Sequence, residues 1–100
     1  MKKEKSVMIV NAGLNPNEKD AFGYYSAHSS PLFKAAGGKL VSKYKVAKSI
    51  VGNIEIQLVV IMEFPNNQAI IKVFESEAYK ELLPFRDRAF TELDVFIGNE

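Results

Sequence analysis

The sequence has no cysteine, and that absence excludes several kinds of protein. Disulfide scaffolds, thiolate zinc sites and thiol catalysis all require cysteine, and a chain without it is assigned by default to the cytoplasm. Histidine is almost as scarce: His28 is the only one, and no acidic residues have ligand spacing around it, so we expect no metal site. A glycine-rich phosphate loop is also missing, because Gly37-Gly38 follows a predicted helix rather than a strand, and we expect no cofactor.

A surplus of charge of one sign is absent as well. The 13 basic and 12 acidic side chains give a net charge of +1, which leaves no patch able to hold a nucleic-acid backbone. No segment approaches the ~20 apolar residues of a membrane span. The apolar stretch behind the basic start is too short for a signal peptide, whose apolar core takes ~7–15 residues. We predict one domain over residues 1–100 with a flexible tail over residues 1–5, and neither a nucleic acid nor a membrane as partner.

One long apolar run does occur, at residues 58–65 with the sequence LVVIMEFP. Its odd and even positions are both apolar, and Glu63 is the only exception before the closing proline. A strand with one wet face would alternate apolar and polar residues. The run therefore predicts a central strand that is covered on both faces.

Capping residues mark the expected helix boundaries in the first half. Asn15 suits an N-cap, Pro16 suits the first helical position, and Glu18 is placed to reach back to the cap. This helix should continue to about residue 29, where Ser30-Pro31 predicts a kink and a second short helix over residues 32–36. Gly37-Gly38 then suits a left-handed helix stop.

Similar signals divide the second half. Gly52-Asn53 predicts a turn that joins an extended segment at 39–51 to the central strand as a hairpin. Within that segment, even-numbered positions from Leu40 should share one face and the lysines the other. Asn66-Asn67 should cap a helix over residues 68–74, and Ser76 should start a new turn. Residues 6–12 and 94–98 are the remaining strands.

The element order is thus β-α-β-β-α-β, which is the order of the ferredoxin-like split βαβ motif. We predict an α+β fold with a four-stranded antiparallel sheet and helices on one face only. The other face would then expose more apolar area than monomers usually tolerate, because the central strand is apolar on both sides. A second copy packed sheet against sheet would cover it, so we predict a homodimer.

Three motifs carry a resemblance to a known family: Gly37-Gly38-Lys39, the strand end at 60–65 (VIMEFP) and the stretch 76–86 (SEAYKELLPFR). Together they are similar to the motifs of the small bacterial DUF1330 proteins, over nearly the whole chain. The resemblance implies the dimeric α+β barrel superfamily, which includes cofactor-free monooxygenases, muconolactone isomerase-like enzymes and many proteins with no assigned activity. Lys43-Tyr44-Lys45 departs from the family pattern, which commonly has a glycine pair there.

Two residues are candidate catalytic bases. His28 has the only side chain that titrates near neutral pH, and the helical pattern places it on the inner face of the first helix. The alternative is a hydrogen-bonded structural histidine. Glu63 interrupts the apolar strand, so burial would raise its pKa as in many acid–base residues. The alternative is an ion pair with Arg86 or Arg88.

Three residues are candidate ligand contacts: Tyr25, Tyr79 and Arg86. Tyr79 and Arg86 are seven apart, which places them on one helix face unless Pro84 disturbs it. A tyrosine and an arginine at a cavity mouth would suit a small carboxylate or enolate. The alternative is that Arg86 pairs with an acidic neighbour while Tyr79 packs its ring and leaves its hydroxyl at the surface.

Three functions remain open from the sequence. The first is a protein that holds a small organic ligand between sheet and helices. The second is a cofactor-independent monooxygenase or isomerase acting on an enolisable or aromatic substrate, and the third is a purely structural dimerisation module. A cavity of roughly 300 Å³ or more would support ligand binding.

Overall fold

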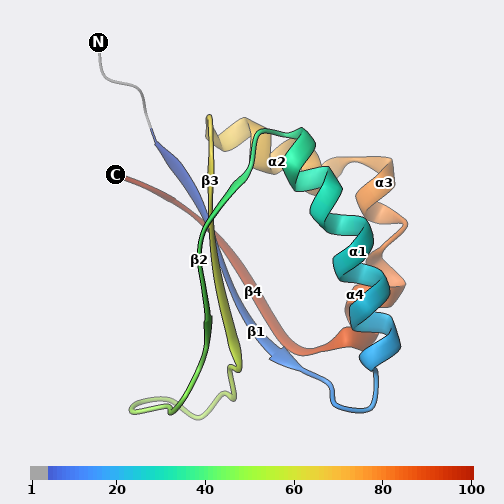
Figure 1. Ribbon diagram of the computed structural model, residues 1–100, viewed down its shortest axis with the longest axis vertical. Coiled ribbons are helices and arrows are strands. Elements are labelled where there is room, and N and C mark those ends of the chain that lie inside the picture. The colour runs from blue at the N-terminus through green and yellow to red at the C-terminus, as the bar shows by residue number, and fades with distance from the viewer. Residues whose placement is uncertain (1–4) are drawn as a thin grey trace.

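The computed structural model describes residues 5–100, and its elements follow the predicted order (Figure 1). The strands are β1 (Ser6–Leu14), β2 (Lys39–Lys45), β3 (Leu58–Phe64) and β4 (Phe90–Asn99). The helices are α1 (Lys19–Ala35), α2 (Asn67–Glu75), α3 (Glu77–Lys80) and α4 (Leu83–Ala89). Lys5 is the one described residue of the predicted tail; the rest of that tail lies outside the described residues. Over residues 5–100, no helix combines the length and apolar character that crossing a membrane requires.

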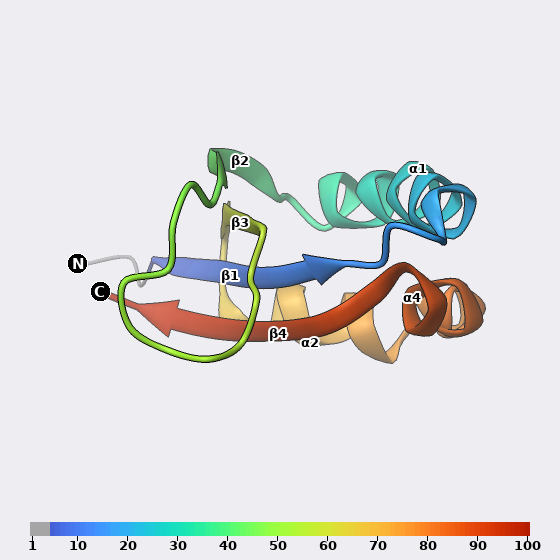
Figure 2. The ribbon, with the colours of Figure 1, turned by 90° about the horizontal axis from the view of Figure 1, so that it is seen from below.

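The four strands form one antiparallel sheet in the order β2-β3-β1-β4. All helices lie on one side of this sheet, which leaves the other side bare (Figures 1 and 2). The predicted ferredoxin-like α+β fold is therefore confirmed. Below, the inner face is the side of the sheet toward the helices, and the outer face is the opposite side.

β3 has the predicted bounds and is flanked by β2 and β1. Met62 and Phe64 lie on the inner face, while Val59 and Ile61 lie on the outer face and are only half-buried. β3 was predicted to be covered on both faces. In a single chain, only the face toward the helices is covered.

β2 differs from its prediction in length and in the side chains that share a face. It ends at Lys45, and residues 46–57 form a connection instead of a tight hairpin. Its pairing with β3 shifts between Leu40 and Ser42, as in a β-bulge. Leu40 lies opposite Met62 and Lys43 lies opposite Val60, so the bulge brings both onto the inner face.

α1 is one continuous helix, so the predicted break at Pro31 is wrong. An internal proline costs roughly 3 kcal/mol of helix propensity. Burial of Phe33, which is 6% exposed in the core, offsets part of that cost. The predicted start is also wrong, because Asn15 Oδ1 accepts the Asn17 amide at 3.0 Å in a local turn and α1 begins only at Lys19.

The end of α1 follows the prediction. Gly37 has a φ of 94°, and the Gly38 and Gly37 amides donate to the carbonyls of Phe33 and Lys34 at 2.9 and 3.0 Å. These two bonds are those of a Schellman motif. A Cβ on Gly38 would lie 2.7 Å from the Phe64 ring, so the same glycine also lets the chain pass close to the core.

β4 is longer than predicted because it pairs with β1 along its whole length, from Ser6 opposite Asn99 to Leu14 opposite Phe90. The polar residues at its start gave no strand signal from sequence. The core lies where the inner face meets α1, α2 and α3. Its buried members are Met8, Phe33, Phe64, Ile70, Val73, Tyr79 and Leu82.

Candidate functional site

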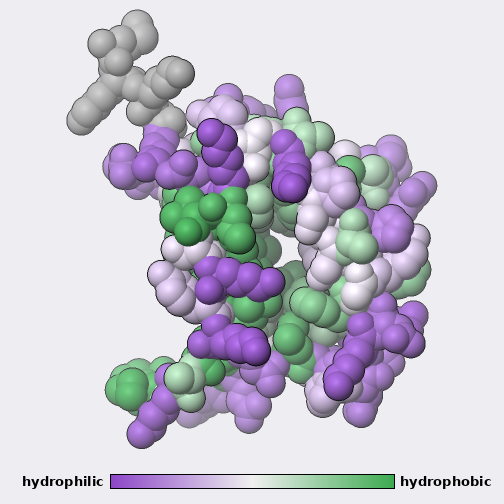
Figure 3. Space-filling model, in the orientation of Figure 1, coloured by the Kyte–Doolittle hydropathy of each residue, from purple (hydrophilic) through white to green (hydrophobic). Residues whose placement is uncertain are grey.

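A cavity of about 680 Å³ lies between α1 and the inner face of the sheet; it is called the inner cavity below. Its sheet wall is apolar and includes Val10, Leu58 and Val60, while Phe22 and Phe33 contribute from α1. The space-filling view shows the corresponding opening between sheet and helices (Figure 3). A cavity of this volume is large enough for a small organic molecule.

Short side chains explain why the space stays open. Ala12 on β1 and Ser26, Ser29 and Ser30 on α1 line the inner cavity, where longer apolar residues would have filled it. Ser29 is 5% exposed and Ala12 is 1% exposed, so both lie in the interior of the protein. The inner cavity therefore remains open because the side chains at these positions are small.

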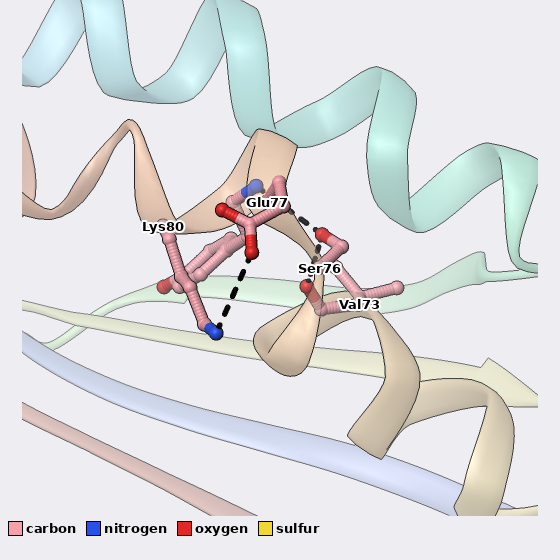
Figure 4. A network of polar contacts seen from close by, with 5 residues as sticks. Val73, Ser76, Glu77 and Lys80 are labelled. Carbon is pink, nitrogen blue, oxygen red and sulfur yellow. Dashed lines mark hydrogen bonds and ion pairs between the residues drawn. The ribbon is translucent and has the colours of Figure 1, made fainter.

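Ser76 positions the first of the predicted ligand residues, Tyr79. The Ser76 hydroxyl donates to the Val73 carbonyl at 2.6 Å and accepts the Tyr79 amide at 3.2 Å (Figure 4). It thus closes α2 and caps α3 at once, and the predicted new turn at Ser76 is confirmed. Tyr79 is 1% exposed, so the alternative in which its hydroxyl reaches the surface is wrong.

The structure brings together Tyr25, Tyr79 and Arg86, the three candidate ligand contacts. The two tyrosine hydroxyl oxygens are 2.6 Å apart, and Arg86 Nη1 donates to Tyr79 Oη at 3.3 Å. Pro84 does not prevent this, because it lies in the first turn of α4, where its missing N–H costs no helical bond. Arg86 also lies 3.9 Å from Asp87, so the predicted acidic neighbour is present.

Arg86, Tyr79 and Tyr25 form a chain of hydrogen bonds. Arginine can only donate, so Tyr79 Oη accepts from Arg86. Either hydroxyl could donate in the bond between Tyr79 and Tyr25, and Ser29 also hydrogen-bonds with Tyr25. Because Tyr25 lines the inner cavity, this chain brings a polar hydroxyl to the cavity wall.

Burial, followed by the hydrogen bond with Tyr79, raises the pKa of Tyr25 far above its ordinary value of 10.0. Arg86 and Ser29 act in the opposite direction but are weaker. Tyr25 is therefore a neutral hydrogen-bond donor across the physiological range. It suits an oxygen acceptor on a ligand.

His28 does not face the inner cavity, so its predicted place on the inner side of the helix is wrong. It is exposed, its Nδ1 lies 2.9 Å from the Tyr24 carbonyl, and its ring stacks on Tyr24 at 3.9 Å. Tyr25, Ser29 and Phe33, spaced by four, form the inner stripe of α1. Tyr24 and His28 form the next stripe around the helix.

Glu63 also lies outside the inner cavity. It is on the outer face, and its carboxylate is 2.9 Å from Lys5 Nζ. The predicted partners are wrong: Arg88 instead binds Glu18 at 2.7 Å, and Arg86 binds Tyr79. The Glu63 hydrogen bond and charge raise the pKa of Lys5. Neither candidate base thus faces the inner cavity.

Sequence reasoning missed the basic residues that line the inner cavity: Lys34 at the end of α1, and Lys39 and Lys43 on β2. The bulge that turns Lys43 inward left no signal in the local alternation. The serine-rich stretch of α1 was a usable signal, since small polar residues on an otherwise aromatic helix indicate a solvated wall.

The fold defines the class of protein: an α+β ferredoxin-like domain with a single antiparallel sheet, helices on one face, and a cavity between them. The sequence matches the family described as a domain of unknown function, DUF1330, over residues 7–98, so the chain belongs to the DUF1330 family. Among curated proteins, none matches the chain.

Solved structures show the same fold at low sequence identity. A protein of unknown function from Rhodopseudomonas palustris has a TM-score of 0.81 at 20% identity, over 97% of this chain and 82% of that one. A provisionally named antibiotic biosynthesis monooxygenase from Nitrosomonas europaea has a TM-score of 0.70 at 13% identity, over 100% and 93%. A nipsnap family protein of unknown function from Agrobacterium tumefaciens has a TM-score of 0.62 at 15% identity, over 100% and 91%.

Proposed function

We propose that this protein binds a small organic molecule in the inner cavity, with the Tyr25 hydroxyl donating a hydrogen bond to an oxygen of the ligand. The observation that supports this is the partly buried Tyr25 hydroxyl, bonded to Tyr79, at the wall of a largely apolar cavity of about 680 Å³. Tyr79 and Arg86 fix the orientation of that donor from behind. A preorganised donor in an apolar site gives orientation and specificity to a ligand.

Binding is favoured over base catalysis by the make-up of the cavity wall. Among the described residues that line the inner cavity there is no carboxylate and no histidine. The monooxygenase name belongs to a structural relative at 13% identity, which is a likeness of fold alone. A turnover that begins by removing a proton from an enolisable substrate would need a base brought by the substrate or by another chain.

We also propose that the protein is a homodimer whose outer sheet faces pack together. What supports this is a row of apolar side chains across three strands, in which Ile9 lies between Ile61 and Phe96. Phe96 is 51% exposed in the single chain. Isologous packing of two such faces would cover the row without any other partner.

The binding proposal is tested with N-phenylnaphthylamine, an uncharged fluorophore that brightens in apolar sites. Two neighbouring residues of α1 give a matched pair of variants: Ser26 lines the inner cavity, whereas Ala27 is exposed. Ser26→Phe should fill the cavity and abolish the saturable fluorescence, while Ala27→Phe should titrate like the wild type, with circular dichroism as the check on folding. Absence of saturable binding to the wild type, or equal binding by a folded Ser26→Phe variant, would overturn the proposal.

A further inference from the structure

The space between sheet and helices is lined on two sides by differently charged residues. A second cavity of about 770 Å³ lies toward β4 and shares Phe74, Phe90, Leu93 and Val95 with the inner cavity. These shared apolar residues form the middle of the space. A molecule held there would have one end toward β2 and the other toward β4.

The β2 side is basic. Lys34, Lys39 and Lys43 line the inner cavity, and no acidic residue is among its described lining residues. Lys39 lies opposite Glu63 on β3, so its side chain shares the outer face with that carboxylate, whereas Lys43 lies opposite Val60 and points inward. The positive charge on this side is therefore not cancelled within the wall itself.

The β4 side is acidic. The lining of the second cavity includes Glu75, Asp87 and Glu92. Its basic residue, Arg86, is engaged with Asp87 at 3.9 Å and with Tyr79. An anion would be repelled from this side and attracted to the other, since apolar walls focus the field of charges at a cleft.

We propose that the ligand is an amphipathic organic anion whose acid group lies between Lys34 and Lys43 while its apolar body reaches toward Phe74 and Phe90. This rests on the proposed function, and it adds the chemical class and the orientation of the ligand. Tyr25, between these ends, donates to an oxygen on the body of the ligand. A carboxylate, sulfonate or phosphate head would satisfy the same lysines.

The test compares two fluorophores with the same ring system, uncharged N-phenylnaphthylamine and anionic anilinonaphthalene sulfonate. The wild type should bind the anion more tightly, and added salt should reduce that preference. Lys43→Met should reduce it by roughly threefold to tenfold, in the range of a partly exposed ion pair. Lys80→Met makes the same change of charge at a position outside both cavities and should leave the preference unchanged.

The outcomes separate this inference from the proposed function. If the uncharged probe fails to bind the wild type, the proposed function itself is overturned. If the uncharged probe binds but the anion binds no more tightly, the charge inference alone is overturned. Equal effects of Lys43→Met and Lys80→Met would also overturn it, because the preference would then arise from net charge. Loss of both probes in Ser26→Phe places the measured binding in the inner cavity.

Discussion

Met8 and Ile9 are neighbours on β1, yet Met8 is 2% exposed beneath the helices while Ile9 is half-buried on the outer face. The same contrast runs across the sheet, where Met62 packs on the core and Ile61 does not. Both faces are apolar, so composition does not distinguish them. What distinguishes them is cover: helices of the same chain pack on one face, and no described element of the chain packs on the other (Figures 1 and 2).

The two faces also differ in how polar groups are placed. On the inner side, a chain of hydrogen bonds runs from Arg86 through Tyr79 to Tyr25. On the outer side, the described ion pair between Lys5 and Glu63 lies at the border of the apolar row. The inner side therefore fits the proposed small ligand, whereas the outer side fits the proposed packing against a flat apolar surface of a second copy.

The largest expected effect comes from placing a carboxylate on each face in turn. Met8→Glu would bury an unpaired charge in the core, which costs several kcal/mol of a total stability of roughly 5–15 kcal/mol, so we expect it to unfold the chain. Ile9→Glu should leave the fold intact and dissociate the dimer, because its charge would be buried only in the interface. Native mass spectrometry and circular dichroism measure the two outcomes.

Gln68→Glu, which adds the same charge at an exposed position of α2, serves as the control and should remain dimeric. A wild type that has the mass of one chain at micromolar concentration would contradict the proposed dimer. So would a folded Ile9→Glu variant that stays dimeric.

Removing the central hydroxyl of the inner polar chain should have the next largest effect. Tyr79→Phe leaves Arg86 and Tyr25 without their shared partner in a buried site, and we expect a loss of about 1–2 kcal/mol in the free energy of unfolding. Urea denaturation measures this. Tyr24→Phe alters an exposed tyrosine of α1 and should change stability little. An equal loss of stability in both variants would show that the hydrogen bonds of the Tyr79 hydroxyl do not stabilise the fold.

Local signals in the sequence predicted much of what builds the inner side. Asn66 caps α2 by accepting the Ala69 amide at 2.8 Å, as its position before an apolar helix indicated. Tyr79 and Arg86 were expected on one helix face; they lie on the successive short helices α3 and α4 and still meet, because both belong to one short stretch of chain. Features set by neighbours in sequence are within reach of such reasoning.

Features that depend on contacts between residues far apart in the sequence could not be predicted in this way. Glu63 pairs with Lys5 only because β1 and β3 lie side by side, and Lys43 turns inward only because of a bulge against β3. His28 was misplaced because Tyr24 and Tyr25 are both aromatic. The pattern of α1 therefore could not decide which of two adjacent stripes faces the sheet. The orientations of Glu63, Lys43 and His28 are set by their tertiary contacts and not by the periodicity of the sequence.

A smaller effect should follow from the cap that holds Tyr79 in place. Ser76→Ala removes both the bond to the Val73 carbonyl and the bond from the Tyr79 amide, and should cost about 1 kcal/mol of unfolding free energy. Ser76→Asp keeps an acceptor for the amide but has no proton for the carbonyl, so its stability should lie between those of wild type and Ser76→Ala. Urea midpoints give the order. An unchanged midpoint in Ser76→Ala would show that packing alone positions Tyr79.

The last expected effect appears only above pH 10.0 and is the pH dependence that Tyr25 gives to the inner side. Its pKa is raised in the folded chain, so above pH 10.0 the unfolded chain loses this proton first and binds fewer protons than the folded chain. The free energy of unfolding therefore falls as pH rises, by up to about 1.4 kcal/mol per pH unit from this group. Urea denaturation below and above pH 10.0 should show a smaller fall in Tyr25→Phe than in wild type. An identical fall in both would mean that folding does not protect the Tyr25 hydroxyl from deprotonation. The proposed difference between the polar groups of the two faces would then be contradicted.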